Sequence, residues 1–145
     1  MTAGDDAGGV PSADPPEGVV VRRASPRDHL GVLRVVDGAD LELSAATTER
    51  RIDAGTVVVA DHDNRIVGAL VAVEREDGAH VEAVAVRRRR RDQGIGSALV
   101  AHAAGLWTPL TAEFDPSVKP FYDSLGFDCE NQGDRYRGVL RATDN

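Results

Sequence analysis

The sequence predicts a single domain of mixed α/β class, with a mixed, mostly antiparallel sheet of six to seven strands flanked by about four helices. A chain of 145 residues with 41% hydrophobic content suits one compact core. Its apolar residues change from a helical to an extended pattern and back several times along the chain. A helical segment also separates two strand-like segments, which predicts one parallel crossover and helices on the faces of the sheet.

The amino-terminal segment differs in composition from the rest of the chain. Residues 1–17 consist largely of Gly, Pro, Ala and Asp, with little to bury, and are predicted to be a disordered acidic tail. The remaining residues, 18–145, form the predicted folded domain. It begins with residues 18–23, GVVVRR, a β-branched run that is typical of a strand.

Two helices are predicted between this strand and the next one. Ser25, Pro26 and Asp28 supply an N-cap, a first-turn proline and an acid at the third helical position. The helix that follows is expected to carry on its apolar side Leu30, Leu33 and Val36. Residues 45–55, AATTERRIDAG, are a weaker helical candidate that Gly55 ends.

The rest of the chain reads as strands first and then as alternating elements. Three extended segments joined by Asp, Asn and Gly turns predict an antiparallel meander over residues 56–61, 65–74 and 79–86. A helix rich in alanine and leucine over about 94–107 leads to a strand at 109–114. A helix at 117–126, stopped by Gly126, and a hairpin over 127–142 close the domain.

The chain is acidic, with a net charge of −7, yet five arginines follow one another from Arg87 to Arg91. Without these five, 12 basic residues face 24 acidic ones, and this acidic remainder argues against a nucleic-acid partner. Cys129 is the only cysteine, which excludes an internal disulfide and favours a cytoplasmic location. We expect a soluble protein without a membrane partner, because neither a signal-peptide core nor a membrane-length apolar run is present.

The arginine run stands between a strand that ends at Val86 and a helix that begins near Gly94. Backbone N–H groups in the first turn of a helix lack intrahelical partners, so a phosphate can accept hydrogen bonds from several of them. Glycines at positions 94 and 96 would let phosphate oxygens approach the main chain closely. The spacing matches neither the P-loop, G-x-x-x-x-G-K-[ST], nor the dinucleotide fingerprint, G-x-G-x-x-G.

The stretch RDQGIG, from Arg91 to Gly96, resembles the acetyl-coenzyme-A pyrophosphate loop of the GCN5-related N-acetyltransferase (GNAT) family, whose motif is Q/R-x-x-G-x-G/A. The resemblance extends from RIVGALVAVE to KPFYDSLGF. The family's FYxxxGF ending is matched by Phe121, Tyr122, Gly126 and Phe127. The resemblance implies a GNAT-like three-layer fold whose fourth and fifth strands splay apart, and it makes residues 18–145 an N-acetyltransferase domain.

The resemblance also implies a ligand and the residues that bind it. Acetyl-coenzyme A is the expected cosubstrate, with its pantetheine arm on the fourth strand and its pyrophosphate at the loop. The residues at the matching positions are Val84, Ala85, Val86, Arg91, Asp92, Gln93, Gly94, Ile95, Gly96 and Ser97. Tyr122 matches the family's general acid, which protonates the departing thiolate. Asp115 stands where the family often has an asparagine, so we expect a different contact there.

An attacking amine must lose a proton, and two residues of the fourth strand could accept it. Period-two alternation over residues 79–86 places His80, Glu82, Val84 and Val86 on one face of the strand. His80 or Glu82 could take the proton directly or through a water, and a water chain without a dedicated base is the alternative. The histidines show no ligand spacing, so no metal site is predicted.

Together these features favour an enzyme that moves an acetyl group from acetyl-coenzyme A to a primary amine by direct attack in a ternary complex. One alternative is a non-catalytic sensor of acyl-coenzyme A. Another is a nucleic-acid-binding module, for which six aromatic residues offer little base stacking. The acceptor, a small molecule or a protein amine, is expected between the segment from Gly38 to Gly55 and the hairpin near residues 132–137. Family members are often dimers, so a homodimer is one expected state.

Overall fold

The computed structural model describes residues 14–38 and 43–141. Residues 1–13, most of the expected acidic tail, and residues 39–42, in the expected acceptor wall, lie outside the described residues. Within the two described ranges, no helix combines the length and the apolar content that crossing a membrane requires.

The helices and strands follow the predicted order. The strands are β1 (Val19–Arg23), β2 (Val57–His62), β3 (Arg65–Glu74), β4 (Ala79–Val86), β5 (Leu110–Phe114), β6 (Asp128–Asn131) and β7 (Tyr136–Leu140). The helices are α1 (His29–Gly38), α2 (Ala45–Asp53), α3 (Ile95–Leu106) and α4 (Lys119–Ser124). Short 3₁₀ turns precede three of the helices: η2 (Pro26–Asp28), η3 (Arg88–Arg90) and η4 (Pro116–Val118).

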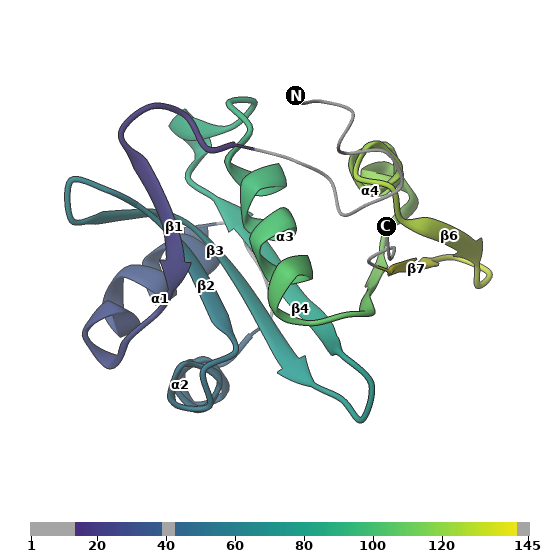
Figure 1. Cartoon of the computed structure of the whole chain (residues 1–145), viewed down its shortest axis with the longest axis horizontal. Coiled ribbons are helices and arrows are strands. Elements are labelled where there is room, and N and C mark those ends of the chain that lie inside the picture. The colour runs from purple at the N-terminus through teal and green to yellow at the C-terminus, as the bar shows by residue number, and fades with distance from the viewer. Residues whose placement is uncertain (1–13, 39–42, 142–145) are drawn as a thin grey trace.

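One sheet of seven strands organises the described residues, in the order β1-β2-β3-β4-β5-β7-β6 (Figure 1). Neighbouring strands are antiparallel except β4 and β5, which are parallel and joined by α3. The mixed, mostly antiparallel sheet with one crossover is therefore confirmed.

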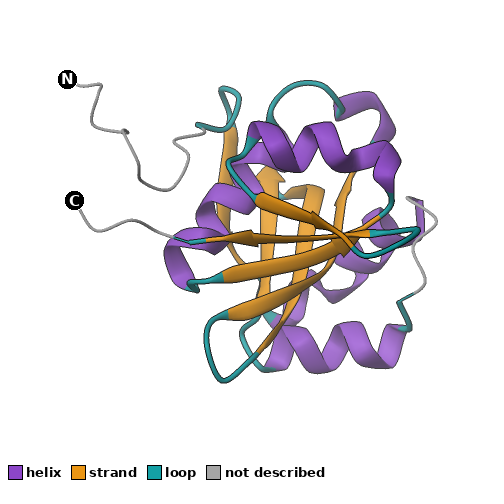
Figure 2. Ribbon diagram, turned by 90° about the vertical axis from the view of Figure 1, so that its right-hand side faces the viewer, coloured by secondary structure: helices purple, strands orange, loops and turns teal. Residues whose placement is uncertain are grey.

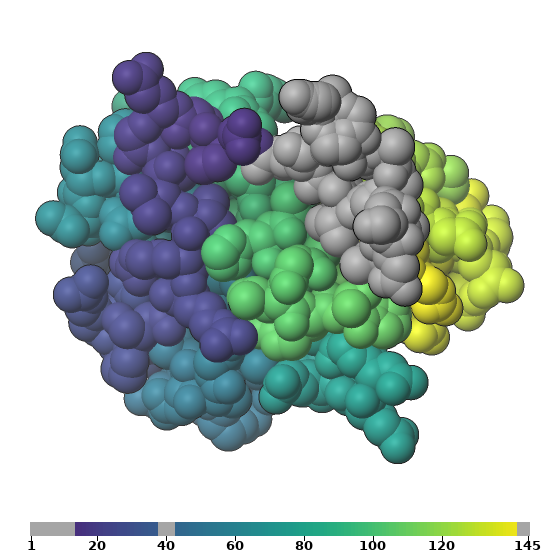
Figure 3. All heavy atoms as spheres, viewed as in Figure 1, coloured from purple at the N-terminus to yellow at the C-terminus, as the bar shows by residue number. Residues whose placement is uncertain are grey.

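Helices cover both faces of the sheet, which gives three layers (Figure 2). Two separate clusters of buried residues lie on the two faces. One cluster holds Val32 of α1 and Ile52 of α2, and the other holds Leu99 of α3 and Tyr122 of α4. In the surface view, α3 in green occupies the middle of one face, between β1 in purple and the carboxyl-terminal hairpin in yellow (Figure 3).

The parallel strands β4 and β5 pair over only part of their length. Residues 79–81 of β4 pair with residues 110–112 of β5, and no pairing continues beyond them. The rest of β4, from Glu82 to Val86, has no β5 partner, and its residues 83–86 stay paired with β3 on the other side. The predicted splaying of the two central strands is therefore present.

A β-bulge in β4 changes which side chains share a face. Val81 pairs with Ala72 of β3 and Ala83 pairs with Val71, so Glu82 between them has no partner opposite. The β4 residues of the α3-side core are Ala79, Val81, Val84 and Val86, and those of the α1-side core are Ala83 and Ala85. One extra residue shifts the two-residue period by one position. The expectation that His80 and Glu82 share a face with Val84 and Val86 is therefore wrong, and the Glu82 carboxylate lies on the α2 side, where Arg51 binds it.

The predicted start of the first helix is confirmed, but its predicted apolar face is confirmed only at Val36. The Asp28 carboxylate accepts a hydrogen bond from the Ser25 N–H at 2.8 Å, as an N-terminal cap requires. Leu30 is 58% exposed, and the buried residues of α1 are Val32, Val35 and Val36. The helix packs closely on β3, because a Cβ at Gly31 would lie 2.7 Å from the Ile66 side chain.

Candidate functional site

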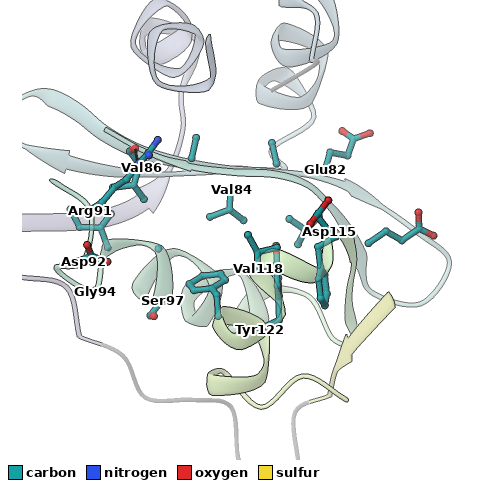
Figure 4. Close-up of a pocket in the computed structure, with 18 of the residues that line it drawn as sticks. Glu82, Val84, Val86, Arg91, Asp92, Gly94, Ser97, Asp115, Val118 and Tyr122 are labelled. Atoms are coloured by element: carbon teal, nitrogen blue, oxygen red, sulfur yellow. Dashed lines mark hydrogen bonds between the residues drawn. The ribbon is translucent and has the colours of Figure 1, made fainter. Parts of the chain in front are cut away.

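A cavity of about 970 Å³ lies where β4 and β5 separate. Its walls are β4, the connection from β4 into the first turn of α3, the end of β5, η4 and α4. In Figure 4, β4 runs along one side of the cavity, with Val84 directed toward Tyr122 and the Glu82 side chain directed to the opposite side of the strand, while Arg91 and Gly94 lie at one end. Asp115 lies toward the other end, and Tyr122 projects from α4 on the side opposite β4.

The start of α3 forms an anion-binding cradle at one end of the cavity. The Ala98 N–H donates to the Gly94 carbonyl at 3.0 Å, so the N–H groups of residues 95–97 precede this bond and are available to a ligand. Gly94 has a φ of +88°, in the left-handed region that glycine adopts without strain. The unpaired N–H groups and the positive end of the helix dipole therefore face the cavity.

Nine of the ten residues predicted to bind the cofactor line this cavity, and Gln93 is the exception. The Gln93 side chain accepts a hydrogen bond from Arg90 Nε at 3.0 Å. This bond joins two residues of the loop between β4 and α3. Arg91 Nε donates to the Val86 carbonyl at 3.1 Å and so fixes the loop to the end of β4. Arg90, which also lines the cavity, was not singled out from the sequence because it is one of five identical neighbours.

The backbone of β4 is accessible from the gap. Alternate residues of a strand direct their N–H and C=O groups to opposite edges, so part of the β4 backbone faces β3 and part faces the gap. Glu82 as a whole residue is exposed, although only 24% of its side-chain surface is accessible. The main chain must therefore contribute to the exposed surface, and Glu82 lines the cavity. These backbone groups can pair with the amides of an extended ligand.

Tyr122 lies at the centre of an aromatic cluster on the α4 side. Its ring stacks on Phe114 with centroids 4.1 Å apart and meets Phe121 and Phe127 edge to face. Burial raises the pKa of the Tyr122 hydroxyl to about 12, so the group is protonated at neutral pH. Among the described residues the hydroxyl has no hydrogen-bond partner, and the side chain lines the cavity. The group can therefore donate a proton to a ligand.

Glu82 lines the cavity and is held by a residue that the sequence analysis did not identify. Arg51 of α2 donates to both carboxylate oxygens of Glu82, at 2.7 and 3.1 Å. This pairing raises the pKa of Arg51. This ion pair thus connects α2 to the strand that lines the cavity. The two residues are 31 positions apart in the sequence, so no local pattern could indicate the contact.

His80 does not line the cavity. Its Nδ1 lies 2.7 Å from the Thr111 hydroxyl, where β4 and β5 are still paired. Burial first, and then the charge of Arg75, lower the pKa of His80, so the imidazole is neutral at neutral pH. Of the two candidate bases, the structure brings only Glu82 to the cavity wall.

Further cavity residues come from the end of β5, from η4 and α4, and from the β6–β7 turn. They are Glu113, Phe114, Asp115, Val118, Phe121 and Arg135. Asp115 accepts a hydrogen bond from the Ser117 N–H at 2.9 Å, so it caps η4, and this bond lowers the pKa of its carboxyl. Arg135 lies in the hairpin segment expected to contact the acceptor. The other residues become neighbours only through the crossover, so sequence spacing does not indicate them.

The molecule is thus a mixed α/β protein with an open sheet whose single parallel pair separates beside a helix start that can bind an anion. The model of the acetyltransferase (GNAT) domain family matches residues 53–129, more than half of the chain. The chain therefore belongs to the GNAT acetyltransferase family.

Solved structures of acetyltransferases share this fold. Ard1 from Thermoplasma volcanium matches with a TM-score of 0.74 and 20% identity, over 88% of this chain and 99% of its own. The PaiA N-acetyltransferase from Thermoplasma acidophilum, solved with coenzyme A, matches with a TM-score of 0.74 and 13% identity, over 85% and 98%. Diaminobutyrate acetyltransferase EctA from Paenibacillus lautus was solved with L-2,4-diaminobutyric acid and coenzyme A. It matches with a TM-score of 0.67 and 19% identity, over 92% of this chain and 98% of its own. A comparison with curated protein sequences finds no match.

Proposed function

We propose that this chain is an acetyl-coenzyme-A-dependent N-acetyltransferase that acts on a primary amine by direct attack in a ternary complex. The observation that carries the proposal is the single cavity that extends from the cradle at the start of α3 to the hydroxyl of Tyr122. Acetyl-coenzyme A supplies an activated thioester when bound. Family membership and the coenzyme A held by similar folds support this choice of cosubstrate.

The cavity has fitting groups for two parts of this cosubstrate, the pyrophosphate and the pantetheine arm. The N–H groups of residues 95–97 would bind the pyrophosphate, with Arg90 and Arg91 adding positive charge nearby. The backbone of residues 84–86 would pair with the pantetheine amides in the gap. A side chain at Gly96 would project toward the Phe121 ring, because a Cβ there lies 3.4 Å from it. Glycine at this position therefore keeps the passage between α3 and α4 open.

Two side chains would move the protons. The Glu82 carboxylate accepts the proton that the amine loses as its nitrogen bonds to the acetyl carbon. The Tyr122 hydroxyl donates its proton to the sulfur as the carbon–sulfur bond breaks. Because Arg51 already bonds both Glu82 oxygens, the amine must share one of them, directly or through a water. His80, on the other side of the bulge and away from the cavity, is not the direct base in this scheme.

The acceptor end of the cavity favours a cationic amine. Glu82, Glu113 and Asp115 line it with three carboxylates, against Arg135 in the lining and Arg51, which pairs with Glu82, so one negative charge is in excess. An ammonium group is attracted there before it is deprotonated, and the excess negative charge disfavours an acidic acceptor. Diaminobutyrate, the acceptor named for one structural neighbour, is a small molecule with a second amine of this kind.

The decisive experiment combines binding with turnover. Calorimetry is expected to give one acetyl-coenzyme A site per chain. A panel of polyamines, diamino acids and amino-terminal peptides is then assayed by thiol release, with mass spectrometry of the acetylated product. Gly96→Trp, which fills the space beside Phe121, is expected to abolish both signals. Gly105→Trp is the matched control, since its position in the same helix is open to solvent, with nothing within 4 Å of an added Cβ.

The same assay tests the base. Glu82→Gln is expected to lower kcat about 100-fold and to leave acetyl-coenzyme A binding unchanged, whereas His80→Gln has a much smaller effect. Binding without a product from any amine would contradict the enzyme and favour a sensor of acyl-coenzyme A. Unchanged binding by Gly96→Trp would contradict the assigned site.

A further inference from the structure

A second cavity, of about 490 Å³, lies between α1, the beginning of β3 and the turn η3. Its floor is apolar and consists of Val35, Val67 and Val86. All its other lining residues are arginines: Arg34, Arg65, Arg87, Arg88, Arg89 and Arg90. Three segments that are distant in sequence therefore bring six guanidinium groups to one depression. The arginine run supplies four of them, and the proposed acetyl transfer uses only the last of these four.

No carboxylate lines this second cavity, although the chain contains 24 acidic residues. Within the described residues, none of the six arginines forms an ion pair. Arg34, Arg65, Arg88 and Arg89 also make no side-chain hydrogen bond there, and each is exposed. Like charges that converge without compensation repel one another, so this arrangement is stabilised when an anion enters.

Two of the guanidinium groups are already held in place. Arg87 Nε donates to the Ile66 carbonyl at 3.0 Å. Arg90 donates to Gln93 and to His62 Nδ1, both at 3.0 Å. Each uses only part of its donor set, which leaves other N–H groups free for a ligand. A ligand would therefore meet a partly organised rim and would order only the four exposed side chains.

We propose that this depression is a second ligand site that binds a polyphosphate chain, either free or as part of a nucleotide. Guanidinium groups bind phosphate oxygens in bidentate pairs, and six positive charges match an anion that carries several negative charges. The site lies beside the proposed coenzyme A cavity and shares Val86 and Arg90 with it, but it contains none of the cradle N–H donors. The inference goes beyond the proposed acetyl transfer and does not depend on it.

The shape and surroundings favour a small anion over a nucleic acid. The arginines line one depression of limited volume, and no aromatic side chain lines it for base stacking. The net charge of −7 on the whole chain would repel a long polyanion that extended past the arginines. A short phosphate chain touches only the basic residues.

The test is a calorimetric titration of inorganic tripolyphosphate into the full-length protein, carried out without and with saturating acetyl-coenzyme A. One site per chain is expected in both conditions, with an affinity that falls as salt is added. The double variants Arg34→Gln/Arg88→Gln and Arg65→Gln/Arg89→Gln, all at exposed positions, are each expected to weaken binding about tenfold. Arg75→Gln, in the turn at the other end of β3, is the matched control and should bind as the wild type does.

An ATP titration distinguishes the two sources of the phosphate chain. Tighter binding of ATP than of tripolyphosphate assigns the site to a nucleotide, and equal binding assigns it to the phosphate chain alone. The proposal is overturned if acetyl-coenzyme A displaces tripolyphosphate, because the arginines then belong to the coenzyme A site. The proposal is also overturned if both double variants bind tripolyphosphate as tightly as the wild type does. The absence of saturable binding at low salt would overturn it too.

Discussion

Tyr122 combines a hydrophobic ring and a polar hydroxyl in one buried position. The ring packs in the α3-side core against Phe114, Phe121 and Phe127. The hydroxyl has no partner among the described residues, and the side chain lines the cavity. The same burial that stabilises the core keeps the hydroxyl protonated. Its proposed catalytic role and its structural contribution can therefore be separated by removing the oxygen alone.

Tyr122→Phe should retain the stacked ring and lose the proton donor. We expect kcat to fall about 100-fold, with little change in the KM for acetyl-coenzyme A. Steady-state kinetics with the best acceptor of the panel measures both values. A variant with wild-type kcat would exclude Tyr122 as the acid.

The same substitution has a signature in stability at high pH. The Tyr122 pKa is raised to about 12 in the folded chain, against about 10 in the unfolded chain. The folded chain therefore keeps the proton that the unfolded chain releases above pH 10. The wild type should lose about 2 to 3 kcal/mol of stability as pH rises from 10 to 12, and Tyr122→Phe should lose less. Urea unfolding at pH 8 and pH 11 makes the comparison.

At the scale of elements, the turn between β4 and α3 determines where an anion can bind. Gly94 adopts a left-handed conformation that ends the arginine-rich connection and aims the first-turn N–H groups of α3 into the cavity. Gly133, in the turn between β6 and β7, has a similar φ of +104°. An added Cβ would meet nothing within 4 Å at either position, so the two glycines differ only in what their turns do.

Alanine at these two glycines should separate strain from ligand binding. Gly94→Ala and Gly133→Ala are each expected to cost about 1 to 2 kcal/mol through the left-handed backbone alone. Acetyl-coenzyme A at a hundred times its Kd should raise the Tm of the wild type and of Gly133→Ala by about 5 to 10 °C. Gly94→Ala should lose most of this shift, and thermal unfolding measures it. A full shift in Gly94→Ala would contradict the cradle.

Sequence patterns predicted the elements well, because each depends on local signals such as the Ser25 cap, the turn glycines and the β-branched runs. The apolar face of α1 was predicted correctly at Val36 and wrongly at Leu30. Valines rather than Leu30 face β3, since the close approach at Gly31 orients the helix. The face of His80 was also predicted wrongly, because the β4 bulge depends on pairing with β3. The contact between Arg51 and Glu82 escaped prediction for the same reason: it is a long-range contact.

At the scale of the whole molecule, the first strand is tied to the rest of the sheet by a small charge network. Arg22 bonds the buried Asp28 at 2.8 Å and Asp61 of β2 at 2.9 Å. The hydrogen bond from Arg22 is the main reason that the pKa of Asp28 is lowered, although burial opposes it and the Ser25 N–H adds to it. Breaking this network should therefore lower the free energy of global unfolding.

Asp28→Asn is expected to destabilise the fold by about 1 to 3 kcal/mol at neutral pH, because it removes a charged hydrogen-bond partner from a buried site. The folded-state pKa of Asp28 is below its unfolded value of about 3.9, so its contribution is present above that pH and disappears as pH falls. The difference between wild type and variant should therefore shrink in acid. Urea unfolding from pH 7 to pH 3 tests this.

Asp123→Asn is the control for that series. Asp123 forms an exposed pair with Lys119 at 2.7 Å, within one helix, and its removal should change stability little. If Asp28→Asn were as mild as Asp123→Asn, the proposed importance of the network would be wrong.

The three residue pairs between β4 and β5 are the only ladder that joins one half of the sheet to the other within the described residues. One half contains β1 to β4, and the other contains β5, β7 and β6. A molecule that lies in the gap and pairs with both strands takes the place of the missing rungs. A ligand bound in this way would complete the sheet as an extra strand segment does, and binding should slow amide exchange across the seam between the two halves.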